Sequence, residues 1–154
     1  EIGESHDPET HLIPLVLDAA LGKTPQVEIY GDDYPTPDGT CIRDFVHVVD
    51  LADAHIKCLQ YLNDGASSTS FNIGTGNGYS VKEIIRAAER ICQRTILFKN
   101  SPRRPGDPPE LVAAADKIKR EIGWSPSHSS LDEILETAWT WQKRLRNSSD
   151  SARS

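Results

Sequence analysis

Arginines in two loops rich in glycine and proline give this sequence its clearest potential for ligand chemistry. Arg43 ends the turn-rich stretch GDDYPTPDGTCIR, and Arg103 and Arg104 lie in the basic loop SPRRPGDPP. A planar guanidinium presents paired donors that match the oxygens of a phosphate or a diphosphate. If the two loops converge, they form an anion clamp, in which Asp107 would accept from a sugar hydroxyl and Tyr30 would stack on a base.

Each of these assignments has a plainer alternative. An arginine followed by an acid, as in Arg43-Asp44, commonly forms a surface ion pair. The glycines at 74, 76 and 78 lie between an expected strand and an expected helix, which is the position of a dinucleotide-binding loop. Their spacing is Gly-x-Gly-x-Gly rather than Gly-x-Gly-x-x-Gly, and no acid ends the following strand. The pattern therefore favours a structural turn over direct phosphate binding.

The sequence contains no evident catalytic or metal-binding set. We find no Ser/His/Asp or Cys/His grouping in a supporting context, and the histidines and cysteines lack the spacing of metal ligands. Cys41, Cys58 and Cys92 are far apart and odd in number, which favours a reducing, cytoplasmic compartment. The formal net charge of −6 argues against nucleic acid or an anionic membrane as a partner. No apolar run approaches the roughly 18 residues of a membrane span.

Helical and extended patterns alternate along the chain, which predicts an α/β or mixed α+β fold with a small sheet and about five helices. Asp7 and Pro8 predict the start of the first helix, and Gly22 predicts its end. A capping box of Ser80 and Glu83 predicts another helix start. Strands are expected at 27–30, 41–48, 70–73 and 96–99, and helices at 8–21, 51–62, 81–91, 115–122 and 131–145.

The helix expected over 51–62 has an apolar stripe. Asp50 is predicted to cap this helix, with Asp53 as its partner in a weak capping box. The stripe is expected to face the core, and His55 is expected to pack at its edge. The residues of this stripe are Leu51, Ala52, Ile56, Leu59 and Leu62.

The length of 154 residues is that of one domain, expected over residues 1–146 and followed by a disordered tail at 147–154. The sequence contains no methionine and starts with Glu-Ile-Gly, which favours a piece of a longer protein. Removal of an initiator methionine is the alternative, but such removal favours a small second residue, and Glu1 is not small.

Five motifs, taken in order, resemble the UDP-glucose 4-epimerases of the extended short-chain dehydrogenase/reductase family. They are DPETHLIPLV, IYGDDYPTPDGTCIRDFVHVVDLADAH, FNIGTGNGYSVKEII, RRPGD and ADKIKREIGWSP. The resemblance reaches to about Gln142 and concerns the carboxy-terminal, substrate-binding part of such an enzyme. It implies a lobe that includes, around residues 44–76, a strand and a helix that would complete the Rossmann domain of the full enzyme.

The resemblance implies a role for the residues of the expected clamp. Arg43 and Arg104 resemble the two arginines that contact the diphosphate of the nucleotide sugar. Asp107 resembles the acid that holds the uridine ribose. Tyr30 corresponds to the residue that stacks on the uracil.

Five further residues are assigned to the substrate site by the same resemblance. Glu28 and Ile29 correspond to the short strand along the uracil. His11 and Leu12 correspond to the helix start that touches the sugar nucleotide, although some family members have asparagine in place of His11. Leu111 corresponds to a position near the sugar pocket, where leucine leaves more room than tyrosine.

The resemblance implies NAD as the cofactor of the full-length enzyme, with the NAD loop outside this chain. The catalytic Tyr-x-x-x-Lys motif would also lie outside, because no tyrosine here is followed by lysine four residues on. This chain alone is therefore expected to be inactive. The implied partners are a UDP-hexose substrate and the amino-terminal Rossmann part of the same protein, and the full-length enzyme is expected to be a homodimer.

Other functions remain compatible with the residues. One is another sugar-nucleotide enzyme of the same superfamily, such as a dehydratase, a decarboxylase, or a 4-epimerase of UDP-N-acetylglucosamine or a UDP-pentose. Leu111 leaves the acetylated substrate open. The other is a non-catalytic binding module whose arginines are ordinary surface charges.

Overall fold

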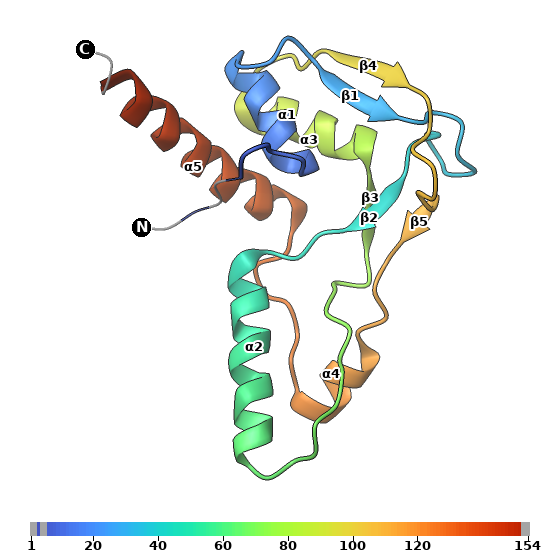
Figure 1. The fold of residues 1–154 in the computed structure, drawn as a ribbon, viewed down its shortest axis with the longest axis vertical. Coiled ribbons are helices and arrows are strands. Elements are labelled where there is room, and N and C mark those ends of the chain that lie inside the picture. Colours follow the sequence, from blue (N-terminus) through green and yellow to red (C-terminus); the bar gives the residue numbers. More distant parts are fainter. Residues whose placement is uncertain (1–2, 4–5, 152–154) are drawn as a thin grey trace.

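The computed structural model describes residue 3 and residues 6–151, with side chains as far as residue 145. The described chain confirms the expected mixed α/β fold, with five helices and five short strands (Figure 1). The elements are α1 (Leu12–Leu21), β1 (Val27–Tyr30), β2 (Ile42–Asp44), α2 (Val48–Asn63), β3 (Gly78–Ser80), α3 (Val81–Cys92), β4 (Phe98–Ser101), β5 (Glu110–Leu111), α4 (Asp116–Ile122) and α5 (Leu131–Ser151).

The strands form two small sheets. β1 and β4 pair in parallel, with Val27 opposite Phe98 and Tyr30 opposite Ser101. The second sheet has the order β3-β2-β5, in which β2 is antiparallel to β3 and parallel to β5. Figure 1 shows this second sheet between two ends of the molecule, one built from α1, α3, α5 and the first sheet, the other from α2 and α4.

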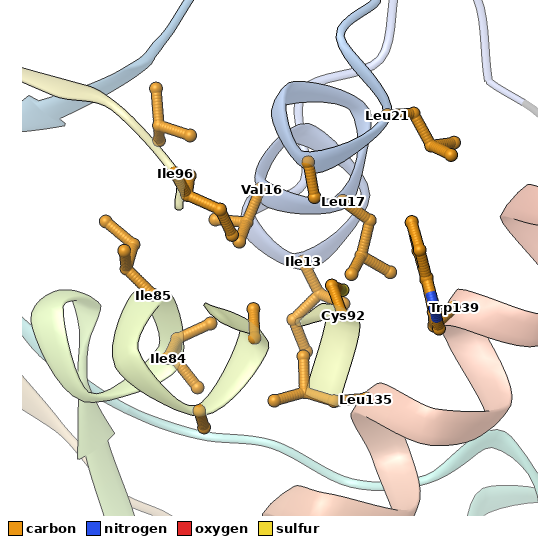
Figure 2. Close-up of a cluster of buried hydrophobic side chains, with 14 of the residues drawn as sticks. Ile13, Val16, Leu17, Leu21, Ile84, Ile85, Cys92, Ile96, Leu135 and Trp139 are labelled. Atoms are coloured by element: carbon orange, nitrogen blue, oxygen red, sulfur yellow. The ribbon is translucent and has the colours of Figure 1, made fainter. Parts of the chain in front are cut away.

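The larger hydrophobic core lies where α1, α3 and α5 pack on one another and on β1 (Figure 2). Val16 and Leu17 of α1, Ile84 of α3 and Leu135 of α5 are completely buried. They recur at helical spacing, so each helix turns one apolar face inward. In α3 the buried face also includes Ile85 and Ala88, and in α5 it includes Trp139.

A smaller cluster holds α2 against α4 and the segment that follows it. It consists of Ala54, Ala115, Ile118 and Trp124, with Phe71 and other partly buried side chains around it. The indole N–H of Trp124 donates to the carbonyl oxygen of Asp50 at 3.1 Å, so this buried polar atom is satisfied.

The apolar stripe of α2 does not face a core among the described residues, and its exposure agrees with a helix that would complete a Rossmann domain outside this chain. The small residue Ala54 is the one that faces the cluster, whereas Ile56 and Leu59 are 57% and 60% exposed. Val48, Val49, Leu51 and Leu62 are exposed as well. Hydrophobic periodicity identifies the apolar face of a helix but not the element that packs against it. Among the described residues, no element covers this face of α2.

The expected start of α2 is wrong. The helix begins after His47, whose Nδ1 accepts from the backbone N–H of Val49 at 3.1 Å. Asp50 instead turns inward and is 3% exposed. Its carboxylate accepts from the N–H and hydroxyl of Ser127, the N–H of His128 and the hydroxyl of Ser129. A long-range contact has therefore replaced the local cap. His55 is exposed, and its Nδ1 lies 2.7 Å from the carbonyl oxygen of Leu51.

The first helix starts four residues later than expected, with His11 rather than Asp7 at the N-cap. Pro14 explains the position. Proline is tolerated in the first turn of a helix, where its missing N–H has no partner, but it would break a helix that had begun at residue 8. Gly22 ends the helix in the left-handed conformation, as expected.

The remaining boundaries agree in part with the sequence. Gly123 ends α4 and the Ser80–Glu83 capping box starts α3, as expected. The extended segment expected at 41–48 is a strand only over β2, and residues 70–73 do not form one. α5 continues to Ser151, and residues 152–154 of the expected tail lie outside the described residues. Of the helices in the described ranges, none could cross a bilayer.

Asp50→Asn is expected to lower the free energy of unfolding by about 3 kcal/mol, because the amide cannot accept all four hydrogen bonds of the buried carboxylate. Urea denaturation measures this. Asp53→Asn is the matched control on the same helix, since Asp53 forms a surface ion pair with Lys57, and it should change the stability by less than about 0.5 kcal/mol.

The same substitution should alter the acid dependence of stability. Burial raises the pKa of Asp50, but hydrogen bonds from Ser129, Ser127 and His128 outweigh it and hold the pKa below its ordinary value. Asp50 therefore adds stability above its unfolded pKa of about 3.9, and this is lost as pH falls through the lower folded value. Asp50→Asn should be less sensitive to pH below about 4. Equal acid sensitivity in both proteins would contradict this role.

Candidate functional site

The three-stranded sheet positions Arg43 at the centre of the candidate site. Arg43 lies on the middle strand, opposite Tyr79 of β3 and Leu111 of β5. Residues that face one another across neighbouring strands share a side of the sheet. The guanidinium is thus placed by two pairings at once, and its side chain is 23% exposed, which leaves it accessible to a ligand.

Arg43 forms an ion pair with Asp107, which lies 64 residues further along the chain. Nη2 donates to Oδ1 of Asp107 at 2.5 Å, and Nη1 donates to the carbonyl oxygen of Ile42 at 2.7 Å. The other carboxylate oxygen of Asp107 lies 3.8 Å from the Sγ of Cys41. The structure therefore brings together two of the predicted site residues, and it joins both loops of the expected clamp.

The guanidinium of Arg104 stacks on the ring of Tyr30, which is the last residue of β1. The guanidinium carbon lies 3.9 Å from the centroid of the ring, a cation–π contact. The hydroxyl of Tyr30 donates to Glu28 at 2.7 Å. The N–H of Asp107 donates to the carbonyl oxygen of Arg104 at 3.3 Å, so Arg104 and the partner of Arg43 lie in one turn. Arg104 thus shares a turn with Asp107, and Tyr30 and Glu28 are linked to this turn through Arg104.

Arg103 has a different place from Arg104. Its guanidinium stacks on the ring of Tyr34 at 4.2 Å, and its Nε donates to Asp33 at 2.6 Å. The hydrogen bond from Arg103, although opposed by desolvation, lowers the pKa of Asp33. Burial raises the pKa of Tyr34, whose hydroxyl has no hydrogen-bond partner among the described residues. Arg103 therefore stabilises the loop at 31–40 and is not one of the two arginines assigned to the diphosphate.

The loop at 31–40 is fastened to the start of α3. The Asp38 carboxylate accepts from the Thr40 hydroxyl at 2.7 Å and from the Ser80 hydroxyl at 2.5 Å. Lys82 donates to the carbonyl oxygen of Asp38 at 3.0 Å. Desolvation raises the pKa of Asp38, but the hydrogen bonds from Ser80 and Thr40 lower it more. These contacts fix the segment that leads into β2.

The glycine loop before β3 is occupied by an internal carboxylate. The N–H groups of Thr75 and Gly76 donate to Asp44 at 3.0–3.1 Å, and the Thr75 hydroxyl donates to it at 2.6 Å. A carboxylate here satisfies the donors that a phosphate would need. This geometry favours the structural turn over a phosphate site, and Asp44 pairs with the loop rather than with Arg43.

The other predicted residues differ in their exposure. Leu111 and Glu28 are exposed, and Leu12 is half-buried at the start of α1. Ile29 is 1% exposed and belongs to the core, so its side chain is directed away from any ligand. His11 is exposed at the N-cap of α1, with Nδ1 2.8 Å from Glu9.

Sequence reasoning missed Tyr34, Asp38 and Cys41 as parts of the frame around Arg43. Their signals were weak, because each contact depends on a partner that the chain brings close only by folding.

A surface depression beside Arg103 is lined by Gly31, Asp32, Asp33, Asn100, Ser101 and Pro102, and neither Arg43 nor Arg104 is among its lining residues.

Known proteins resemble the chain in sequence. The family described as the NAD dependent epimerase/dehydratase family matches residues 2–74. The UDP-glucose 4-epimerase of Lacticaseibacillus casei is 50% identical over 142 residues, which are 92% of this chain and 43% of that protein. The chain thus spans less than half the length of this curated relative.

Solved structures resemble it as well. A crystal structure of UDP-glucose 4-epimerase has a TM-score of 0.91 at 49% identity, over 95% of this chain and 44% of that one. The UDP-glucose-4-epimerase of Stenotrophomonas maltophila was solved with bound NAD and formylated UDP-arabinopyranose. It has a TM-score of 0.90 at 39% identity, over 94% of this chain and 43% of that one. The fold of this chain is therefore found as a part of these enzymes.

Gly39→Ala should destabilise the frame of the site more than Gly106→Ala. Both glycines have left-handed backbone, with φ of 81° and 83°. A Cβ on Gly39 would lie 2.1 Å from the carbonyl oxygen of Asp32, whereas a Cβ on Gly106 would meet nothing within 4 Å. Gly106→Ala is expected to cost about 1–2 kcal/mol for the backbone alone, and Gly39→Ala about 2 kcal/mol more because of the clash.

Urea denaturation of both variants provides the comparison. Equal losses of stability would mean that the loop at 31–40 relaxes without resistance and does not fix the position of β2.

Proposed function

We propose that this chain is the UDP-sugar-binding part of a UDP-glucose 4-epimerase, because residues 2–74 match the NAD dependent epimerase/dehydratase family and one UDP-glucose 4-epimerase is 50% identical over 142 residues. The single observation that supports this most is the meeting of the two loops, in which Asp107 pairs with Arg43 and shares a turn with Arg104. The relatives named above are UDP-glucose 4-epimerases, and one of them binds a UDP-sugar.

In this proposal Arg43 and Arg104 hold the diphosphate. Both are guanidinium groups on ordered segments, so little freedom is lost when they bind a dianion. In the ligand-free chain, Asp107 supplies the negative charge beside Arg43. A diphosphate would share or replace that charge, and Asp107 would then accept from the hydroxyls of the ribose.

Tyr30 is assigned to the base. One face of its ring carries the Arg104 guanidinium, at 3.9 Å. Uracil would stack on the opposite face of the ring. Once Arg104 turns toward the diphosphate, the face that it now covers would also be available to the base. Glu28 and the backbone of Ile29 belong to the same strand and would line the edge of the base.

Three residues are assigned to the sugar side. His11 and Leu12 lie at the start of α1, where the sugar nucleotide would pass. Leu111 lies beside Arg43 in the sheet and is 61% exposed. A leucine at this position leaves space for a larger sugar, so the proposal includes UDP-N-acetylhexosamines as well as UDP-hexoses.

The glycine-rich loop before β3 does not offer a place for the diphosphate of NAD. The N–H groups of Thr75 and Gly76 in this loop are bonded to Asp44, so the loop does not fit a dinucleotide. We assign NAD and the catalytic Tyr-x-x-x-Lys to a part of the protein outside this chain. The residues described here would fix UDP, remote from the reacting carbon, and their binding energy would hold the nucleotide while the sugar turns.

Titration calorimetry with UDP and UMP tests the diphosphate clamp. Arg43→Ala and Arg104→Ala should each weaken UDP binding by about tenfold to a hundredfold, since a hydrogen bond to a charged group is worth about 1.5–3 kcal/mol. UMP should bind more weakly than UDP and should lose less affinity in both variants, because it has one phosphate fewer.

Arg90→Ala is the matched control. Arg90 is a surface arginine of α3 that pairs with Asp132 at 2.7 Å, far along the chain from the two loops, and its removal should leave UDP binding unchanged. Equal affinities for UDP and UMP, or UDP binding that survives loss of both Arg43 and Arg104, would refute the clamp.

The proposal also assigns a partner to the exposed apolar face of α2. We define this face as Val48, Val49, Leu51, Ile56, Leu59 and Leu62, all of which are exposed. A patch of this kind on one helix marks an interaction surface. The relatives are more than twice as long as this chain. The proposed occupant is the amino-terminal Rossmann part of the same protein, whose sheet α2 would cover.

Without that partner, the chain is expected to self-associate through the apolar face of α2. The double substitution Ile56→Lys, Leu59→Lys should reduce the associated fraction in sedimentation velocity, because it places two charges within the patch. Leu97→Lys is the matched control, since Leu97 is 64% exposed but lies before β4, away from α2. A chain that is monomeric and melts cooperatively without any substitution would contradict this expectation.

A further inference from the structure

Three side chains with metal-binding atoms meet at the entry to α1. They are His6, Glu9 and His11, and their ligand atoms all lie within 4.8 Å of one another. The two imidazole rings have centroids 4.8 Å apart and are tilted by 55°. The spacing of these residues matches no regular element, so the sequence alone did not group them.

Glu9 is the fixed member of this group. Its Oε1 accepts from the backbone N–H groups of Thr10 and His11, at 2.7 and 2.8 Å. Its side chain is 17% exposed, against 56% for His11. These two hydrogen bonds hold the carboxylate in place before any ligand arrives.

Glu9 and His11 already have the separation of two ligands of one ion. Oε1 of Glu9 lies 2.8 Å from Nδ1 of His11. Two donors about 2.05 Å from a metal ion, at a right angle, are about 3 Å apart. His6 is exposed and has to approach by a small side-chain movement. If Nδ1 of His11 instead donates to Glu9, the carboxylate orients the ring and Nε2 is the ligand atom.

Gly3, on the N-terminal side of the cluster, lies against α5, where a Cβ on it would meet the ring of Trp141.

We propose that His6, Glu9 and His11 bind one divalent transition-metal ion of the Zn²⁺ or Ni²⁺ type, with water in the remaining positions. Two imidazoles and one carboxylate suit such ions and not Mg²⁺ or Ca²⁺, which prefer oxygen ligands alone. The argument for the metal site does not use the UDP-sugar proposal, although His11 is assigned to both sites. Metal binding is therefore measured without nucleotide.

Titration calorimetry with NiCl₂ and ZnCl₂, on chain prepared without a histidine tag, tests the site. We expect one ion per chain and no measurable heat with MgCl₂. His6→Ala and His11→Ala should each lower the affinity about tenfold or more, and Glu9→Gln should weaken binding as well. His11 makes no side-chain hydrogen bond to cap α1, so His11→Ala should leave the helix intact, which circular dichroism verifies.

His55→Ala is the matched control, because His55 is an exposed histidine on α2 and lies outside the cluster. It should bind the metal as the unsubstituted chain does. The site is overturned if neither ion binds with a defined stoichiometry, if the double variant His6→Ala, His11→Ala binds as before, or if His55→Ala loses as much affinity as the cluster variants.

Discussion

The carboxylate of Asp44 joins the three segments on which the candidate site is built. It accepts hydrogen bonds from Thr75 and Gly76, before β3, and from the N–H of Ala113, after β5, at 3.3 Å. These two strands flank β2, in which Asp44 directly follows Arg43. A Cβ on Gly74 would lie 2.4 Å from Ala113 and 2.5 Å from Asp44, so the close approach also needs a glycine. The position of the guanidinium therefore follows from one partly buried carboxylate next to it in the chain.

Around this carboxylate, the polar groups of the candidate site satisfy one another. Asp107 forms an ion pair with Arg43. The guanidinium of Arg104 stacks on Tyr30, and that of Arg103 stacks on Tyr34. Such contacts stabilise cations in the absence of a ligand, and they keep the side chains near the geometry in which an anion would meet them. A ligand has then to exchange contacts rather than to order free side chains, which lowers the entropic cost of binding.

Local signals in the sequence predicted the local parts of the fold. The Ser80–Glu83 box, the end of α1 at Gly22 and the end of α4 at residue 122 depend on neighbours within a few residues, and all are confirmed. The resemblance assigned Arg43, Asp107, Arg104 and Tyr30 to one site, and the fold links them through successive contacts, whereas their roles toward a ligand stay predictions.

The errors concern interactions that join distant segments. Asp50 looks like a cap because the hydroxyls that bind it lie more than 70 residues away. The apolar side of α2 looks like a core face because hydrophobic periodicity does not depend on whether a partner is in the same chain. Pro14 was the overlooked signal, since it limits how far upstream the first helix can begin.

The two hydrophobic clusters have a further consequence for how the molecule opens. The larger joins α1, α3, α5 and β1, whereas the smaller has four buried members around α2 and α4. Less buried apolar surface gives a lower free energy of local unfolding. The end of the molecule built from α2 and α4 should therefore unfold locally first, while the arginine loops keep their arrangement. Amide protons would exchange with solvent at two distinct rates, and the half of the chain that contains the larger core would exchange more slowly.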